Sequence, residues 1–371
     1  MVGLIVMEVN FNDIKMVYEK EVKIHTKNKG KVYRFDRFKM ENLTRIYDML
    51  SNNEYKNFKY NIFLIKKPKY RIVMSLDITD KIINHYITRY ILMPKLKRCL
   101  DDRNVATRKN LGRDYGIRLV KKYLEYYKIM DNCYVLKMDI SKYFYRIDHN
   151  VLKNMIKNDL TLEEYELISM IIDSTNREYI NKKIIELKNN ELRYIKERIK
   201  EVEDIPIYEF GKGLPIGNMS SQFLSIFYLN RLDHKIIHDY RLKRYIRYMD
   251  DILIFSSDRE YLKKVKEEIE KELRETYLLD VNKKKTFIVN AKNGFTFCGY
   301  RFRLIGKKTV INVCSYTKKR VSKRVKEVRY LYDNNLLSFE QVFSSINTYY
   351  NGFKYGSKKK IQRIVDKIFF G

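Results

Sequence analysis

Two adjacent aspartates interrupt a β-rich stretch in the second half of the chain. They are Asp250 and Asp251 in "RYIRYMDDILIF", residues 244–255, where "YIRYM" and "ILIF" both favour strands. The pattern predicts a hairpin with the two carboxylates at a tight turn. Because aspartates are common in turns without any chemical role, the pair alone does not predict a reactive site.

A third carboxylate comes from a segment far upstream. "CYVLKMDI", residues 133–140, is typical of a buried strand, and Asp139 lies at its end. If this strand and the hairpin lie side by side in one sheet, Asp139, Asp250 and Asp251 share one cleft. Three clustered carboxylates repel one another strongly unless a hard divalent cation binds between them. The sequence therefore predicts a site for two Mg²⁺ ions, with Mn²⁺ as the alternative ion, which suits in-line phosphoryl transfer.

The elements around these residues are mostly helical. Residues 40–130 and 151–205 carry helical patterns, and the second stretch is charged enough to be a solvated amphipathic helix. "IFLIKKPKYRIVMSLD", residues 62–77, predicts a hairpin of two short strands joined through Pro68. "GKGLPIGNMSSQ", residues 211–222, is rich in glycine and leads into an apolar helix that Ser220 or Ser221 would cap.

Composition limits the class of protein and its partners. The chain has 371 residues, 45% of them hydrophobic and 14% aromatic, which predicts a folded core in one large domain or two to three closely packed subdomains. Lys and Arg number 76 against 46 Asp and Glu, a formal charge of +30. This excess favours a polyanionic partner such as a nucleic acid, and a merely basic solvated surface is the alternative.

Several other classes are disfavoured by what the sequence contains. The cysteines are Cys99, Cys133, Cys298 and Cys314, and their spacing predicts neither zinc ligands nor a disulfide framework. The N-terminal run "MVGLIVMEVNF" is too short to cross a bilayer, so we expect a soluble cytoplasmic protein without a membrane partner. The pattern GxxxxGK[ST] is missing, which excludes a P-loop ATPase.

Four motifs together resemble those of reverse transcriptases, in the family's order and across most of the chain. They are "MDISKYFYRID", "GLPIGNMSSQ", "RYMDDILIF" and "FTFCGYRF". The resemblance implies an RNA-directed DNA polymerase, a nucleotidyltransferase that synthesises cDNA from a template RNA. It also implies an α+β right-hand polymerase fold, with fingers, a palm built on an antiparallel sheet with helices, and a helical thumb. The implied subdomains are 1–132 for the fingers and an N-terminal extension, 133–150 for the palm, 151–210 for a helical fingers/palm region, 211–300 for the palm and 301–371 for the thumb.

The same resemblance assigns roles at the reaction centre. Asp139 and Asp250 would be the principal metal ligands, assisted by the carbonyl of Ile140, and Asp251 would complete the catalytic triad. Phe144 would close the floor of the nucleotide pocket against a 2′-hydroxyl, which implies a preference for deoxynucleotides. A core aromatic is the alternative for Phe144.

Basic residues are assigned to the phosphates. The resemblance places Lys67 and Arg71 on the triphosphate of the incoming dNTP, where a lysine and a bidentate arginine fit the chemistry. Lys285 would lie near the leaving pyrophosphate, with Lys283 and Lys284 as neighbouring alternatives. "FTFCGYRF" resembles the hairpin that holds the primer end.

A basic helix follows in "TKKRVSKRVKEVRYLY". Its pattern places Val321, Val325 and Val328 on an inner face. A thumb helix that follows the backbone of the RNA–cDNA duplex fits this pattern, and a generic basic amphipathic helix is the alternative. The outer residues that would bind nucleic acid are Lys319, Arg320, Lys323 and Arg324.

The glycine-rich motif indicates a subfamily. Most reverse transcriptases have Gln-Gly, three residues and Ser-Pro, whereas this chain has Ile216, Gly217, three residues, Ser221 and Gln222. Replacing Gln by Ile216 removes an amide that contacts the incoming nucleotide, and looser checking of base pairs is expected. Ile216, Gly217 and Gln222 are accordingly assigned to dNTP binding.

This form of the motif resembles the reverse transcriptases of diversity-generating retroelements. Those enzymes copy a template RNA with errors at adenines and deliver the mutated cDNA into a target gene, a process called mutagenic retrohoming. The resemblance implies a template RNA and a small basic accessory protein as partners.

Two other readings are kept open. A retron, group II intron-like or phage-defence reverse transcriptase would share the motifs but would copy faithfully or act without an external template. A catalytically silent RNA-binding scaffold is the alternative outside enzymes. The intact set of three aspartates argues against the scaffold, because clustered carboxylates carry an electrostatic cost.

Overall fold

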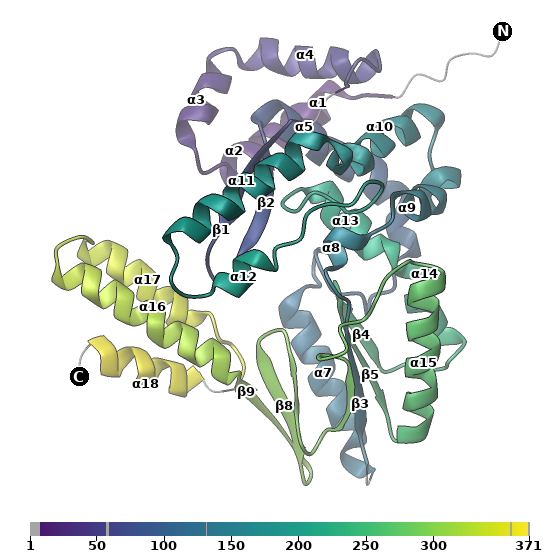
Figure 1. Ribbon diagram of the computed structural model, residues 1–371, viewed down its shortest axis with the longest axis vertical. Helices are drawn as coiled ribbons and strands as arrows, with labels where there is room; N and C mark the ends of the chain where they lie inside the picture. Colours follow the sequence, from purple (N-terminus) through teal and green to yellow (C-terminus); the bar gives the residue numbers. More distant parts are fainter. Residues whose placement is uncertain (1–7, 57–58, 131, 357, 370–371) are drawn as a thin grey trace. The chain divides into compact units, whose positions relative to one another are not determined.

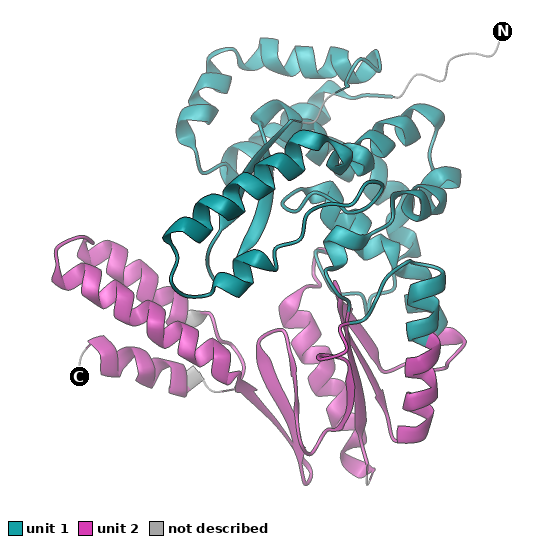
Figure 2. Ribbon diagram, viewed as in Figure 1, with its two compact units in different colours: residues 1–107, 140–235, 269–281 teal, residues 108–139, 236–268, 282–371 magenta. Residues whose placement is uncertain are grey.

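The computed structural model describes residues 8–56, 59–130, 132–356 and 358–369. The first seven residues, most of the short N-terminal apolar run, lie outside these ranges. The chain forms two compact units, shown in Figure 2. Unit 1 comprises residues 1–107, 140–235 and 269–281, and unit 2 comprises residues 108–139, 236–268 and 282–371. Because each unit is assembled from three segments, neither is a simple N- or C-terminal half of the chain.

Unit 1 begins with a set of short helices. Asn10 caps the first, since its side-chain oxygen accepts a hydrogen bond from the backbone N–H of Asn12 at 2.8 Å. Asn28 caps a later one in the same way, through Lys31 at 3.1 Å. The elements are α1 (Phe11–Val17), the π-helical turn η1 (Tyr18–Val22), α2 (Lys23–His25), α3 (Lys29–Arg37) and α4 (Lys39–Ser51).

The predicted hairpin follows in unit 1. Strands β1 (Tyr60–Ile65) and β2 (Arg71–Leu76) pair antiparallel, with Tyr60 opposite Leu76. The expectation for residues 62–77 is therefore confirmed. The helical segment after it is α5 (Ile78–Tyr86), the π-helical turn η2 (Ile87–Leu92), α6 (Met93–Leu96) and the short 3₁₀ turn η3 (Lys97–Cys99).

The second segment of unit 1 is helical, as the pattern over residues 151–205 predicts. Helix α11 (Glu178–Tyr194) buries Ile180, Ile184 and Glu191, so most of its surface is solvated, as expected. The neighbouring elements are α8 (Tyr143–Arg146), α9 (His149–Ile156), η5 (Lys157–Asp159), α10 (Leu162–Ile172), η6 (Asp173–Asn176) and α12 (Ile199–Glu203).

The cap predicted for the next helix is wrong. Helix α13 (Met219–Tyr228) begins after Asn218, so neither Ser220 nor Ser221 is its N-cap. Both serines are buried, and the hydroxyl of Ser220 accepts a hydrogen bond from the side-chain amide of Asn84 at 2.7 Å. Helices α14 (Asn230–His238) and α15 (Arg259–Glu275) then contribute residues to both units.

Unit 2 contains a four-stranded antiparallel sheet in the order β4–β5–β3–β6. Its strands are β3 (Tyr134–Asp139), β4 (Tyr245–Tyr248), β5 (Asp251–Ser256) and β6 (Phe287–Asn290). The buried strand predicted at 133–140 is confirmed, and it pairs on both edges. Helix α7 (Arg113–Tyr126) and the turn η4 (Tyr127–Ile129) pack on the sheet, because the hydroxyls of Tyr123 and Tyr127 donate to the carbonyls of Tyr245 and Phe255, both at 3.1 Å.

The remainder of unit 2 is a small sheet followed by three helices (Figure 1). Strands β7 (Phe295–Phe297), β8 (Tyr300–Ile305) and β9 (Lys308–Val313) form the sheet. Cys298 and Gly299 make the two-residue turn between β7 and β8 with φ of 47° and 83°, values that suit a tight antiparallel hairpin. Helices α16 (Ser315–Asp333), α17 (Phe339–Asn351) and α18 (Lys358–Phe369) pack against one another.

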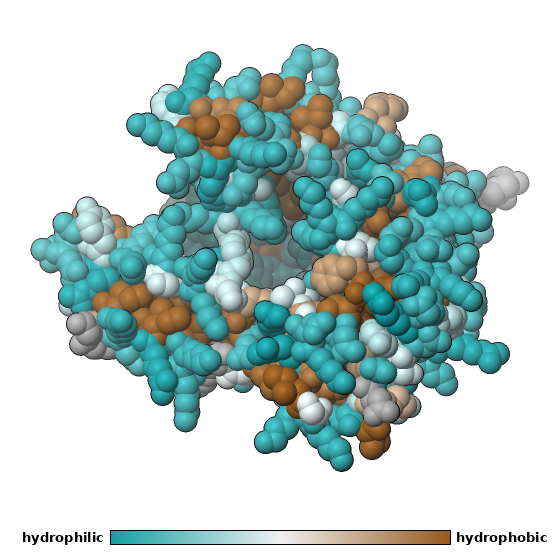
Figure 3. All heavy atoms as spheres, turned by 60° about the horizontal axis from the view of Figure 1, so that its bottom comes forward, coloured by the Kyte–Doolittle hydropathy of each residue, from teal (hydrophilic) through white to brown (hydrophobic). Residues whose placement is uncertain are grey.

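One face of the surface is largely polar. Figure 3 shows one face on which hydrophilic side chains predominate and hydrophobic ones form separate patches. In the part of the chain that the structure describes, none of the helices combines the length and the apolar character that a membrane span requires.

Candidate active site

The antiparallel pairing of β3 with β5 places Asp251 directly opposite Asp139. Opposite residues on neighbouring strands project from the same face of a sheet, so these two carboxylates are neighbours. Asp250 lies in the turn between β4 and β5, which Tyr248 and Asp251 close as partners. The predicted hairpin is confirmed, with Asp251 as the first residue of β5 and not a residue of the turn. All three aspartates therefore lie at one end of the unit 2 sheet.

Two lysines offset part of the negative charge at this end of the sheet. The Nζ of Lys285 lies 3.0 Å from Oδ2 and 3.2 Å from Oδ1 of Asp139. The Nζ of Lys137 lies 3.3 Å from Oδ1 of Asp251 and donates a 2.6 Å hydrogen bond to the carbonyl of Thr296. Lys137 is buried on β3, two residues before Asp139, and its ion pair compensates part of the charge at the carboxylate cluster.

The acidic groups influence one another electrostatically. Burial raises the pKa of Asp251 to about 6, the ion pair with Lys137 opposes that rise, and the charges of Asp250 and Asp139 add to it. Among the described residues, Oδ1 of Asp251 is buried without a hydrogen-bond partner, although it lies within ion-pair distance of Lys137. A divalent cation would relieve both the repulsion and the unsatisfied oxygen, so the carboxylate chemistry at this end of the sheet suits such an ion.

The metal assignment stays a prediction. Within the described ranges, no group of three or more His, Cys, Asp or Glu residues is arranged so that it could hold a metal ion. Asp139 and Asp251 contact lysines instead. The carbonyl of Ile140 takes no part in the isolated bridge between Ile140 and Val281. The hydrogen bonds on either side of that bridge run from the N–H of Asn282 to the carbonyl of Asp139, at 2.7 Å, and from the N–H of Ser141 to the carbonyl of Asp280, at 2.8 Å.

A buried arginine positions the turn that carries Asp250. Arg247 lies on β4 with 0% of its surface exposed, and its guanidinium donates to the carbonyl of Met249 at 3.0 Å. Met249 has a left-handed backbone with φ of 58°, which is costly for a residue other than glycine. Neither Arg247 nor Lys137 is among the site residues predicted from the sequence, although each is a basic residue inside an otherwise apolar strand.

In unit 1, the glycine-rich segment at 211–222 lies against β2. The backbone N–H of Met74 donates to the carbonyl of Ile216 at 2.8 Å. Gly217 has φ of 119°, and a Cβ there would lie 3.0 Å from Cγ1 of Val73 and 3.2 Å from the carbonyl oxygen of Met74. Only glycine fits this close approach, and it brings Ile216 next to the strand that begins with Arg71.

Phe144 belongs to the same part of unit 1. Its carbonyl accepts a 2.7 Å hydrogen bond from the N–H of Leu214, so it lies beside the glycine-rich segment. Tyr143 is the core aromatic here, since it is buried and donates to the carbonyl of Ser225 at 2.5 Å, whereas Phe144 is half-buried. Gln222 is half-buried on α13, and Lys67 is exposed at the tip of the β1–β2 hairpin.

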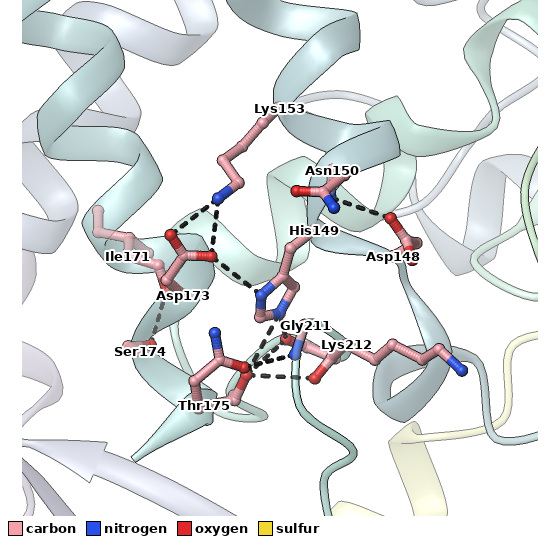
Figure 4. Close-up of polar contacts among 12 residues, drawn as sticks. Asp148, His149, Asn150, Lys153, Ile171, Asp173, Ser174, Thr175, Gly211 and Lys212 are labelled. Atoms are coloured by element: carbon pink, nitrogen blue, oxygen red, sulfur yellow. Dashed lines mark hydrogen bonds and ion pairs between the residues drawn. The ribbon is translucent and has the colours of Figure 1, made fainter.

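A histidine network anchors the glycine-rich segment, as Figure 4 shows. The side chain of His149 is 1% exposed, with Nε2 2.8 Å from the carbonyl of Gly213 and Nδ1 3.1 Å from Oδ1 of Asp173. Lys153 donates to the same carboxylate at 2.8 Å, and Thr175 donates to Gly213 at 3.0 Å. Both ring nitrogens lie within hydrogen-bond distance of an oxygen, so the network fixes the position of the imidazole beside the glycine-rich segment.

The basic helix predicted after the hairpin motifs is α16. Its inner residues Val321, Val325 and Val328 are buried, as expected. A groove of about 500 Å³ between α16 and α18 is lined by Lys318, Lys319, Ser322, Lys323, Lys326 and Ile364. Lys319, Arg320, Lys323 and Arg324 are exposed, and Arg324 pairs with Glu327 at 2.9 Å.

An antiparallel sheet with clustered aspartates at one end, together with helices and a basic helical C-terminal part, is the architecture of a nucleic-acid polymerase palm and thumb. The family described as reverse transcriptase (RNA-dependent DNA polymerase) matches residues 59–302, and the chain belongs to this family. The expected fold class, α+β with a right-hand polymerase architecture, is thereby confirmed. Membership of the family supports the expected enzyme class, an RNA-directed DNA polymerase.

Similar solved structures include two of apo telomerase from Candida tropicalis. One, truncated from the C-terminal domain, is 17% identical with a TM-score of 0.46, and the match covers 69% of this chain and 55% of that one. The other is also 17% identical, with a TM-score of 0.49 and coverage of 83% and 55%. The chain thus spans 55% of the length of each of these telomerases. No curated protein matches the sequence.

Proposed function

We propose that this protein synthesises cDNA from a template RNA by adding deoxynucleotides to a primer end. The observation that supports this most directly is the register of β3 and β5, which pairs Asp139 with Asp251 while Asp250 lies in the adjoining turn. Membership of the reverse transcriptase family supports the same activity. Template RNA, the RNA–cDNA duplex and dNTPs are the proposed substrates.

The carboxylates give the site its chemistry. Asp139, Asp250 and Asp251, with the carbonyl of Ile140, would hold two Mg²⁺ ions, or Mn²⁺ in their place. When bound, such ions act as Lewis acids that stabilise the attacking and leaving oxygens of phosphoryl transfer. Lys285, which contacts Asp139, carries a positive charge and a proton that a leaving pyrophosphate could accept.

Residues of unit 1 would bind the incoming nucleotide. Lys67 and Arg71 are both exposed cations on the β1–β2 hairpin, which suits binding of a triphosphate. Phe144, Ile216 and Gly217 lie close together around the glycine-rich segment, where the sugar and base would be checked. In unit 2, the exposed cations of α16 would follow the phosphate backbone of the duplex.

We further propose that copying is error-prone at template adenines, as in a diversity-generating retroelement. The motif Ile216-Gly217, three residues, Ser221-Gln222 supports this reading. Ile216 has a half-buried apolar side chain and no amide at this position. Its side chain therefore cannot donate a hydrogen bond that would stabilise a correctly paired nucleotide over a mispaired one. A small basic accessory protein is the further partner that this reading requires, and mutagenic retrohoming is the process it serves.

The subdomain assignment goes with this proposal. Residues 133–150 and 211–300 would form the palm and 301–371 the thumb, with residues 1–132 as fingers and N-terminal extension and 151–210 as the helical fingers/palm region. The two compact units follow a different division, because each is built from three segments of the chain.

The decisive experiment supplies the purified protein with primed RNA, dNTPs and Mg²⁺ and sequences the cDNA. Substitutions concentrated at template adenines are expected. Accurate cDNA would support the polymerase activity but would assign the protein to a retron, a group II intron-like element or a phage-defence system. No cDNA from any primed RNA, by a folded protein, would refute the polymerase activity and favour an RNA-binding scaffold.

A further inference from the structure

A second cavity lies in unit 2, away from the aspartates. Its volume is about 410 Å³, within the range of small-ligand sites. Phe255 and Ser256 line it at the end of β5, whereas Asp251 begins that strand. Five residues of extended strand separate Asp251 from Ser256, about 17 Å at 3.3 Å per residue. The cavity is therefore distinct from the carboxylate cluster.

An arginine stacked on tyrosines forms one wall of this cavity. The guanidinium carbon of Arg244 lies 3.2 Å from the ring centre of Tyr126 and 5.6 Å from that of Tyr127. Tyr126 is still 43% exposed, so part of its surface stays open to another planar group. Stacked arginine and tyrosine planes are surfaces on which nucleobases stack.

The opposite part of the lining adds more rings and more positive charge. Tyr240 and Tyr261 line the cavity, and they are fixed to each other because the hydroxyl of Tyr261 donates to the carbonyl of Tyr240 at 2.8 Å. Arg241 and Lys243 are exposed cations in the same lining. Within the described ranges, neither of these two cations, nor Arg244, forms an ion pair with a carboxylate.

The cations and the aromatic rings of the lining together indicate which class of ligand the cavity would bind. Arg241 and Lys243 suit a phosphate, and the stacked planes suit a base, so the two features together fit a nucleotide. The charge of +30 favours a polyanionic strand over a free mononucleotide. An acidic peptide would use the cations and leave the tyrosine faces without a role.

We infer that this cavity binds an unpaired nucleotide of a single-stranded RNA, and so holds the RNA at a point outside the reaction centre. The choice of RNA rests on the proposed function, because RNA is the strand that the protein would copy. The cavity thereby becomes a second RNA contact on unit 2, independent of α16.

Photo-crosslinking locates the bound base directly. The full chain is irradiated with a short single-stranded oligouridine that carries 4-thiouridine, and crosslinked peptides are identified by mass spectrometry. Crosslinks to Tyr126 or Tyr261 are expected, and crosslinks confined to other parts of the chain would overturn the inference. Because no dNTPs are present, the result does not depend on polymerase activity and the two proposals can fail separately.

Matched variants separate stacking from charge. Tyr126→Leu removes the ring and should weaken binding of the same RNA about tenfold in fluorescence anisotropy, while Tyr126→Phe should bind like the wild type. Arg244→Lys keeps the charge but loses the plane, and should also weaken binding. Lys264→Gln removes an exposed cation outside the cavity and gives the effect of charge alone. Equal losses for Tyr126→Leu and Lys264→Gln would contradict a stacking site.

Two competitors identify the source of the nucleotide. Heparin is a polyanion without bases, so the wild type and Tyr126→Leu should bind it with equal affinity. If Tyr126→Leu loses heparin binding and RNA binding to the same extent, the cavity recognises negative charge alone and the inference of a stacking site is wrong. Free UMP should leave the crosslink at Tyr126 in place. If UMP abolishes that crosslink while the RNA stays bound elsewhere, the cavity is a mononucleotide site and the assignment to an RNA strand is wrong.

Discussion

The ammonium nitrogen of Lys285 lies 3.0 Å from Oδ2 of Asp139. Lys285 is held there by the turn after Asn282, whose N–H donates to the carbonyl of Asp139 at 2.7 Å and whose carbonyl accepts the N–H of Lys285 at 2.9 Å. The ammonium group of Lys285 thus pairs with Asp139, a carboxylate that the proposed function assigns to a divalent metal ion. Metal binding and the Lys285–Asp139 ion pair must compete.

Replacing Lys285 tests this competition. Lys285→Met should bind Mn²⁺ or Mg²⁺ several-fold more tightly in the absence of nucleotide, because Asp139 loses its competing cation. Primer extension should nevertheless fall about a hundredfold at saturating metal, because the leaving pyrophosphate loses a proton donor. Calorimetric metal titration and single-turnover extension measure the two effects.

The neighbouring lysine provides the control. Lys283 is exposed on the same turn, and Lys283→Met removes an equal charge without touching Asp139. Similar results for Lys283→Met and Lys285→Met would mean that the effects arise from net charge, and the specific role of Lys285 would be lost.

Asp250 is expected to be essential for incorporation and dispensable for RNA binding. Asp250→Asn should lower primer extension by more than about a hundredfold, because loss of even an outer-shell partner of a metal costs 10–100-fold. RNA affinity, measured by anisotropy, should stay close to that of the wild type. Asp239→Asn, an exposed aspartate outside the cluster, is the matched control. Normal extension by Asp250→Asn in Mg²⁺ would refute the metal assignment.

Ile216 is expected to set fidelity. Ile216→Gln adds an amide beside the nucleotide, which should reduce misincorporation while leaving the backbone bond from Met74 in place. Sequencing of cDNA made from one template by both proteins measures the difference. Ile185→Gln, at a residue 46% exposed on α11, controls for the loss of an isoleucine. An unchanged error spectrum in Ile216→Gln would show that Ile216 does not determine the fidelity of copying.

Asp173 gives a prediction about pH. Burial raises the pKa of this carboxyl, but hydrogen bonds from His149 and Lys153 outweigh burial and hold the pKa below its ordinary value. The lowered pKa stabilises the fold above about pH 4, the range of the unfolded side chain, and this contribution is lost as the pH falls through the folded pKa.

Asp173→Asn should therefore lower the free energy of unfolding at neutral pH. We expect about 1–2 kcal/mol, since the hydrogen bonds from Lys153 are charge-assisted and water screens a carboxylate that is 39% exposed. Urea unfolding midpoints of the two proteins should differ at pH 7, and the difference should shrink as the pH falls below about 4. Asp204→Asn, an exposed aspartate after α12, is the control. If the difference in urea midpoint between the wild type and Asp173→Asn is as large at pH 3 as at pH 7, the lowered pKa of Asp173 is not its cause.

The local patterns predicted the elements well because their causes are local. The strand ending at Asp139 and the hairpin around Asp250 depend on alternation and turn length, which the sequence displays directly. The role of Ser220 could not be predicted in this way, because its hydrogen-bond partner Asn84 lies far away in the sequence and only the folded unit brings the two together. His149 and Arg247 were missed for the same reason: each is buried against carbonyl groups of a turn or loop, and backbone acceptors leave no mark in the sequence.

The close approach at Gly217 has a consequence for motion. Because the backbone of Met74 is bonded to Ile216 and no room remains between Gly217 and Val73, the β1–β2 hairpin cannot swing without carrying the glycine-rich segment with it. Arg71 and Ile216, proposed to contact the phosphates and the base, are thus mechanically linked through β2. We expect a change that weakens the bond between Met74 and Ile216 to affect nucleotide binding and base selection together.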